Sequence, residues 1–112
     1  MSSTRDPAVG RVSSLMPQLI AELERFVAIP SVSATDYPPE THEQLLAARD
    51  LVVELLSGAG VQNVRSLELP NTAPVVKGEI PAPPGAPTVL LYGHYDVVPA
   101  GTRRHGSRRR GR

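Results

Sequence analysis

The chain has 112 residues, enough for one small domain, and its hydrophobic content of 40 % permits a core of Leu, Val and Ile, because aromatic residues make up only 4 %. It contains no cysteine, which excludes disulfides and thiolate metal ligands. The net charge of +1 is unevenly spread, since residues 1–100 carry six basic and eleven acidic side chains whereas residues 101–112 carry six Arg and no acid. We therefore expect a domain over residues 1–101 and a disordered Arg-rich tail over residues 102–112.

Membrane and secretion signals are missing from the pattern. No apolar run approaches the roughly 20 residues needed to span a bilayer, and the opening "MSSTRDPAVG" lacks the apolar centre of a secretory signal. The sequence predicts a cytoplasmic protein without a membrane partner.

The first predicted element is an amphipathic helix over residues 12–28, where apolar residues recur every three or four positions. Ser13 or Ser14 can cap it. A proline is tolerated only in the first turn of a helix, so Pro17 predicts a start near residues 14–16. Pro30 ends the segment and begins a loop.

A second helix is predicted to follow that loop. Thr41, with Gln44 three residues later, fits a capping box, in which the two side chains satisfy the first free N–H groups. Gly58 or Gly60 is expected to end the helix, because glycine readily adopts the backbone conformation that terminates helices.

Beyond residue 60 the apolar period changes to two, which is typical of strands. Residues 61–69 and 73–80 are predicted to pair antiparallel, and the Pro-rich stretch 81–87 cannot join a strand ladder. Residues 88–98, "TVLLYGHYDVV", form a nearly continuous apolar run, which predicts a strand buried on both faces. The expected fold class is α/β, with two N-terminal helices packed on the start of a mixed sheet. Without neighbouring strands, residues 88–98 would become an exposed apolar edge prone to aggregation.

His94 and Asp96 are the candidate site residues. Two positions apart on an extended chain, they point to the same side, at the end of the most apolar predicted strand. A neutral imidazole binds a divalent metal through one ring nitrogen and donates the other N–H to a carboxylate. Spacing alone leaves an alternative open, in which His94 bonds to backbone and Asp96 caps a turn.

Four stretches carry a resemblance to a known family: "FVAIPSVSA" (26–34), "AARDLVVELL" (47–56), "APVVKGEI" (73–80) and above all "LLYGHYDVVPAG" (90–101). Over about residues 12–101 the chain resembles the N-terminal part of the co-catalytic zinc peptidases and deacylases, which include aminoacylase, acetylornithine deacetylase, succinyl-diaminopimelate desuccinylase, glutamate carboxypeptidase and carnosine dipeptidase. It is most similar to the bacterial dipeptidases.

The resemblance implies a hydrolase that uses two zinc ions to cleave amide bonds near a free carboxylate, in small peptides or N-acyl amino acids. It implies that His94 is a ligand of one zinc and that Asp96 is the active-site aspartate supporting this histidine. The family's bridging aspartate, Glu-Glu pair, further acidic ligand and distant histidine have no counterpart here. We therefore interpret the chain as a truncated N-terminal part of the catalytic domain with an incomplete site, and predict that it is inactive alone because one His cannot complete a catalytic zinc set.

The tail "GTRRHGSRRRGR" leaves three interpretations open. It can be a basic arm, which would make the chain a small nucleic-acid-binding protein; this alternative is the least favoured. It can be a solvated tail without a role. Because the resemblance and the composition both change at Gly101, it can also be the product of a frameshift, and the chain a non-functional gene product. The sequence indicates neither the oligomeric state nor the particular substrate.

Overall fold

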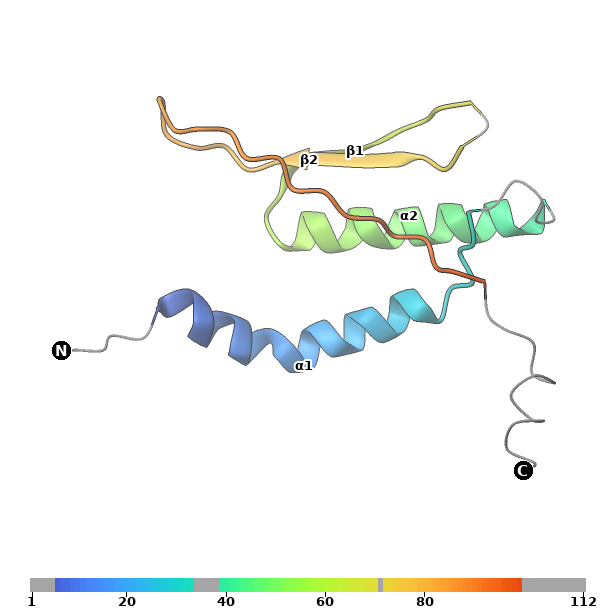
Figure 1. Ribbon diagram of the computed structural model, residues 1–112, viewed down its shortest axis with the longest axis horizontal. Coiled ribbons are helices and arrows are strands. Elements are labelled where there is room, and N and C mark those ends of the chain that lie inside the picture. Colours follow the sequence, from blue (N-terminus) through green and yellow to red (C-terminus); the bar gives the residue numbers. More distant parts are fainter. Residues whose placement is uncertain (1–5, 34–38, 71, 100–112) are drawn as a thin grey trace.

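The computed structural model describes residues 6–33, 39–70 and 72–99, and the predicted tail over residues 102–112 lies outside them. Within the described residues there are two helices and two strands: α1 (Pro7–Val27), α2 (Glu40–Gly58), β1 (Gln62–Leu67) and β2 (Val75–Glu79). The helices stack on one side of a two-stranded antiparallel sheet, with α2 between the sheet and α1 (Figure 1). The predicted α/β class is confirmed.

The packed centre of the molecule is the face between α2 and the sheet. α2 contacts both strands. Its buried residues, Leu45, Ala48 and Leu51, are spaced three apart and therefore share one side of the helix. Val32, from the segment after α1, and Pro74, just before β2, are also buried. The core is small, so its few members carry most of the apolar stabilisation.

The predicted start of the first helix is wrong, because α1 begins at Pro7. Asp6 is the N-cap, and its Oδ1 accepts a hydrogen bond from the Ala8 N–H at 2.9 Å. Pro7 follows in the first turn, where its missing N–H costs nothing. Pro17 consequently lies inside the helix. Its ring and missing N–H disturb the ladder there, and α1 is bent near its middle (Figure 1).

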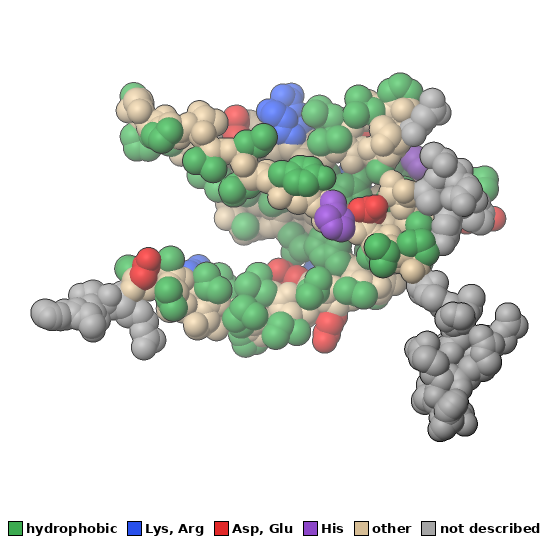
Figure 2. Space-filling view, in the orientation of Figure 1, with side chains coloured by type: hydrophobic (Ala, Val, Ile, Leu, Met, Phe, Trp, Pro, Cys, Tyr) green, Lys and Arg blue, Asp and Glu red, His purple; other side chains and the backbone are tan. Residues whose placement is uncertain are grey.

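α1 contacts the rest of the described chain weakly. None of its residues is buried, although it is strongly amphipathic. An ion pair between Arg25 and Glu54, 3.3 Å from Nη1 to Oε2, links its last turn to α2. Figure 2 shows hydrophobic side chains along α1 and open space between its N-terminal half and the layers above. The helix is thus attached through its C-terminal end.

α2 begins at Glu40, two residues earlier than a cap at Thr41 predicts. Pro39 is the N-cap and provides no side-chain capping bond, so the predicted capping box with Thr41 as the cap is wrong. The predicted end is confirmed: the helix stops at Gly58, with Ala59 as C-cap. Gly60 follows with φ 95°, the left-handed conformation that glycine adopts without strain.

The predicted antiparallel pairing of the two strands is confirmed. The register places two residues of β1, Asn63 and Val64, opposite Gly78 of β2, which is a β-bulge. Asn63 supplies the left-handed residue of the bulge, at φ 53°, and its Nδ2 donates to Glu79 Oε2 at 2.6 Å. A Cβ on Gly78 would lie 2.5 Å from Val61 Cγ1, so a larger residue opposite the bulge would force the Val61 side chain to shift.

The predicted buried strand over residues 88–98 is wrong. Val97 forms a single parallel bridge with Val32, and residues 88–96 pair with neither β1 nor β2. Leu90 is 90 % exposed and Tyr92 is 89 % exposed. A strand inside a sheet needs paired strands along its edges and a packing layer over each face, and the described residues supply only one bridge. The Pro-rich stretch 81–87, by contrast, lies outside any strand as predicted.

Candidate functional site

His94 and Asp96 form a hydrogen-bonded pair. The His94 Nδ1 and Asp96 Oδ1 atoms are 2.9 Å apart. Alternation along the extended backbone brings both side chains to one side, as the spacing predicts. With an ionised Asp96 this geometry requires the proton on Nδ1, because a carboxylate can only accept. The lone pair of Nε2 is then free.

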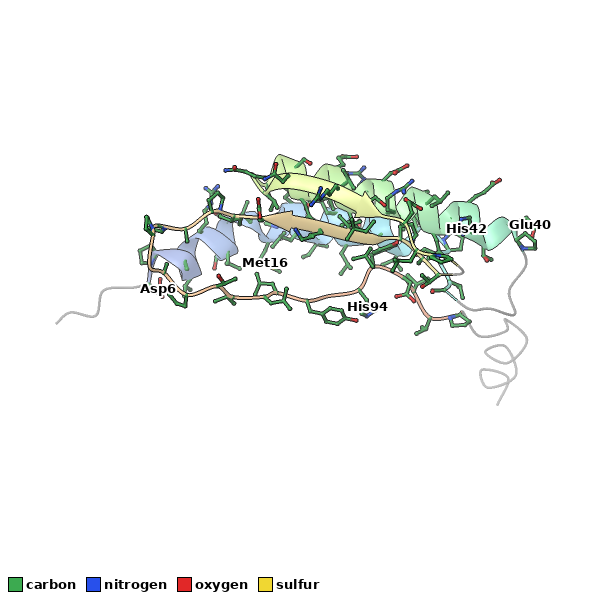
Figure 3. All side chains as sticks on the ribbon, turned by 90° about the horizontal axis from the view of Figure 1, so that it is seen from above. Asp6, Met16, Glu40, His42 and His94 are labelled. Carbon is green, nitrogen blue, oxygen red and sulfur yellow. The ribbon has the colours of Figure 1, made fainter. Side chains whose placement is uncertain are left out.

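The imidazole faces open space. The His94 side chain is 72 % exposed and that of Asp96 is 37 % exposed. Figure 3 shows His94 on the side of the extended segment that is turned away from the helices and the sheet. His42, on α2, lies on a different element and does not point toward His94 (Figure 3). The free Nε2 is therefore accessible to a ligand from solution.

Two contacts hold the segment on either side of Asp96. The Tyr95 hydroxyl donates to the Pro74 carbonyl oxygen at 2.6 Å, which ties the segment to the residue before β2. The Val97 N–H donates to the Ser31 carbonyl oxygen at 3.0 Å, which ties it to the buried chain after α1. Tyr95 alternates with its neighbours, so its ring turns toward the protein while His94 and Asp96 face outward.

Burial and three nearby charged groups act on the Tyr95 hydroxyl. Partial burial raises the pKa of the Tyr95 hydroxyl above its ordinary value of 10.0, the Arg49 guanidinium opposes this rise, and Asp96 and Glu68 add to it. The phenol thus stays protonated, and a hydrogen-bond donor, near neutral pH.

Arg49, one of these charged groups, forms hydrogen bonds with three side chains. Its Nη1 donates to Glu68 Oε2 at 2.8 Å and to Ser66 Oγ at 3.1 Å, so it joins α2 to β1 and the residue after it. Its Nε donates to Asp50 Oδ1 at 2.8 Å. Nε and Nη1 of the guanidinium are occupied by these partners.

The described residues supply a small donor set. Across residues 6–33, 39–70 and 72–99, no three side chains of His, Asp or Glu come together as a metal site. The pair fits one metal ligand with its supporting carboxylate, since the free Nε2 and the bonded Nδ1 have the complementary roles that such a pair needs. The hollow between α1 and α2 involves neither residue; it is lined by Arg25, Ala28, Ile29, Ala47, Asp50, Leu51 and Glu54.

The spacing of His94 and Asp96 therefore predicts their common orientation, and the structure brings them together. The pattern does not identify Tyr95, whose role depends on a carbonyl group 21 residues earlier. The alternation of side chains along an extended segment could have indicated only that Tyr95 points to the opposite side from the pair. Nor does it identify Ser31, which contributes a backbone carbonyl and not a side chain.

The chain is similar to two curated metallopeptidases. It is 29 % identical to the Cys-Gly metallodipeptidase DUG1 of Saccharomyces cerevisiae, over 89 % of this chain and 22 % of the yeast protein. It is 30 % identical to the Cys-Gly metallodipeptidase DUG1 of Candida albicans, over 84 % of this chain and 21 % of that protein. The chain thus spans about a fifth of the length of these relatives. The similarity supports a metallopeptidase family without indicating a particular member.

No protein-family model matches the chain, and no solved structure matches it. No described helix combines the length and the apolar character that crossing a bilayer requires.

Proposed function

We propose that this chain contributes the first metal-binding segment of a metal-dependent hydrolase that cleaves small peptides or N-acyl amino acids. In this proposal His94 binds one of two zinc ions through Nε2. Its Nδ1–H group donates a hydrogen bond to the Asp96 carboxylate. The resemblance of "LLYGHYDVVPAG" to zinc peptidases and the similarity to two Cys-Gly metallodipeptidases support the reaction class. A cytoplasmic location is part of the same proposal, and a sequence that contains no cysteine is in keeping with it.

The observation that carries the proposal is the bond of 2.9 Å between His94 Nδ1 and Asp96 Oδ1. This bond selects the tautomer with the proton on Nδ1 and fixes the plane of the ring. An imidazole held in this way is prepared for a divalent cation, whereas a freely rotating surface histidine is not.

In this scheme Asp96 would keep the proton on His94 Nδ1 and orient the ring, so that Nε2 can bind the metal. Bound zinc would polarise a substrate carbonyl and lower the pKa of a coordinated water. The reaction further needs a carboxylate positioned to accept a proton from that water. Asp96 is engaged with His94 and is a supporting group in this scheme.

The 112 residues by themselves are proposed to be catalytically inactive. Catalytic zinc sites generally have three protein ligands, and His94 with Asp96 is the largest such grouping that the described residues present at this site. The chain incubated with zinc and a dipeptide such as Cys-Gly should therefore show no turnover. Hydrolysis that a chelator abolishes would contradict this proposal.

Metal binding is tested by calorimetric titration of the full chain with Zn²⁺ near pH 7.5. His94→Gln should weaken zinc binding about tenfold or more, because the imidazole nitrogen is lost. Asp96→Asn should weaken it by about 10-fold, the lower end of the effect of removing a supporting carboxylate. His42→Gln is the matched control, since His42 is exposed on α2 and far from the pair. Equal affinity of the wild type and the His94→Gln variant would refute the role of His94.

A further inference from the structure

We propose that Tyr95 is a positioning residue: its hydroxyl donates a hydrogen bond to the Pro74 carbonyl and thereby keeps His94 and Asp96 in the orientation in which they bond to each other. The proposal rests on the proposed metal role of His94 and adds a residue to it. It assigns a specific task to a side chain that makes no contact with a ligand.

The first argument is the lack of other order in the segment. Residues 88–93 pair with no strand, and Val89, Leu90 and Leu91 are exposed. Strand pairing does not fix the backbone of these residues, and a change in their backbone conformation would change the relation of His94 to Asp96. The pair therefore needs a local anchor that the sheet does not provide.

The second argument is the placement of the anchors. Tyr95 lies between the two residues of the pair and bonds to Pro74, while Val97 bonds to Ser31 on the other side of Asp96. Together they fix the backbone at positions 95 and 97. The side chain of Asp96 then has one orientation relative to the ring of His94.

The third argument is the quality of the Tyr95 contact. A separation of 2.6 Å is at the short end for an O–H···O hydrogen bond. Pro74 precedes β2, so its carbonyl belongs to a segment joined directly to the sheet. The hydrogen-bond acceptor of Tyr95 is therefore attached to the sheet, and the bond fixes the position of the backbone between His94 and Asp96.

The test uses nuclear magnetic resonance of the full ¹⁵N-labelled chain without metal, near pH 8. Long-range ¹H–¹⁵N correlations report which ring nitrogen of His94 carries the proton, and the His94→Gln variant assigns the signals. In the wild type the Nδ1–H form should dominate. In Tyr95→Phe, which removes only the hydroxyl, the ratio of Nδ1–H to Nε2–H forms should fall about threefold or more.

Tyr92→Phe is the matched control, since it removes the same atom from a tyrosine that is 89 % exposed in the same segment. It should leave the tautomer ratio unchanged. Backbone amide shifts of α2 and β1 should be the same in both variants. A wild-type ratio in Tyr95→Phe, or an equal change in Tyr92→Phe, would overturn the proposal.

Two further measurements keep the test decisive. Nuclear Overhauser contacts between the Tyr95 ring and Pro74 in the wild type should be present, and their absence would overturn the proposal without any variant. General loss of amide dispersion in Tyr95→Phe would also overturn it, because the residue would then serve folding as a whole.

Zinc titration separates this proposal from the proposed function. Tyr95→Phe should weaken zinc binding about 3- to 10-fold, less than His94→Gln does. A changed tautomer ratio together with zinc binding that is insensitive to His94→Gln would support the positioning role and refute the metal role. Zinc binding that depends on His94 but not on the hydroxyl of Tyr95 would support the metal role of His94 and refute the positioning role of Tyr95.

Discussion

The apolar residues of α2 and those of residues 88–92 look alike in the sequence and differ in the structure. Leu51 is 5 % exposed, whereas Leu90 is 90 % exposed. α2 has the sheet to pack against, and residues 88–92 have no neighbouring strand among the described residues. An apolar run thus predicts a tendency to be buried, and burial itself requires a partner surface.

The sharpest test of this comparison is a matched pair of leucine substitutions. Leu51→Ala should lower the free energy of unfolding by about 2–4 kcal/mol, because it leaves a cavity beneath the sheet. Leu90→Ala should change it by less than about 0.5 kcal/mol, since the side chain is already in solvent. Urea denaturation followed by circular dichroism measures both. Similar losses in the two variants would show that residues 88–92 are packed in solution.

A pair of glycine substitutions compares β2 with α1. Gly78→Ala should destabilise the chain by about 1–3 kcal/mol, since the new Cβ would meet the Val61 side chain opposite the bulge. Gly10→Ala should stabilise α1 by about 0.5–1 kcal/mol, because a Cβ there meets nothing within 4 Å and alanine favours helix. Thermal unfolding of both variants gives the signs. A neutral Gly78→Ala would contradict the close contact at the bulge.

A smaller effect is expected from the two arginines that link elements. Arg49→Ala should cost about 1–2 kcal/mol, because Glu68 and Ser66 lose a donor that is 19 % exposed. Arg25→Ala should cost less than about 0.5 kcal/mol, since its pair with Glu54 is exposed on both sides. Denaturant midpoints of the two variants, measured at low and moderate salt, test the difference. A larger loss in Arg25→Ala would mean that α1 is held more firmly than its contacts indicate.

Local chemistry in the sequence predicts much of the packed half of the fold. The change of period after residue 60 predicts both strands and their antiparallel pairing, and glycine at 58 and 60 predicts the end of α2. The helix starts were less predictable, because Asp6 competes with Ser13 and Ser14 as the cap of α1, and the cap of α2, Pro39, provides no side-chain bond that a motif could reveal. Asp6 with Pro7 was preferred over Ser13 and Ser14, since it allows a longer helix despite Pro17.

Prediction was weakest where a feature depends on distant residues. The strand status of residues 88–98 requires neighbours that no local pattern can guarantee. The spacing of His94 and Asp96 predicts a shared side, and their bond follows from it. The contact of Tyr95 with Pro74 depends on where the segment lies relative to the residue before β2, and no periodicity encodes that placement.

The bend of α1 has a consequence for how the molecule opens. Pro17 divides the helix into two short halves, and short helices are marginally stable in water without tertiary contacts. The N-terminal half extends away from the other elements, while the C-terminal half is joined to α2 by Arg25 (Figures 1 and 2). Amide protons before the bend should therefore exchange with solvent independently of global unfolding, and those of α2 should exchange last. Local unfolding would then begin in the N-terminal half of α1, continue in its C-terminal half and reach α2 last.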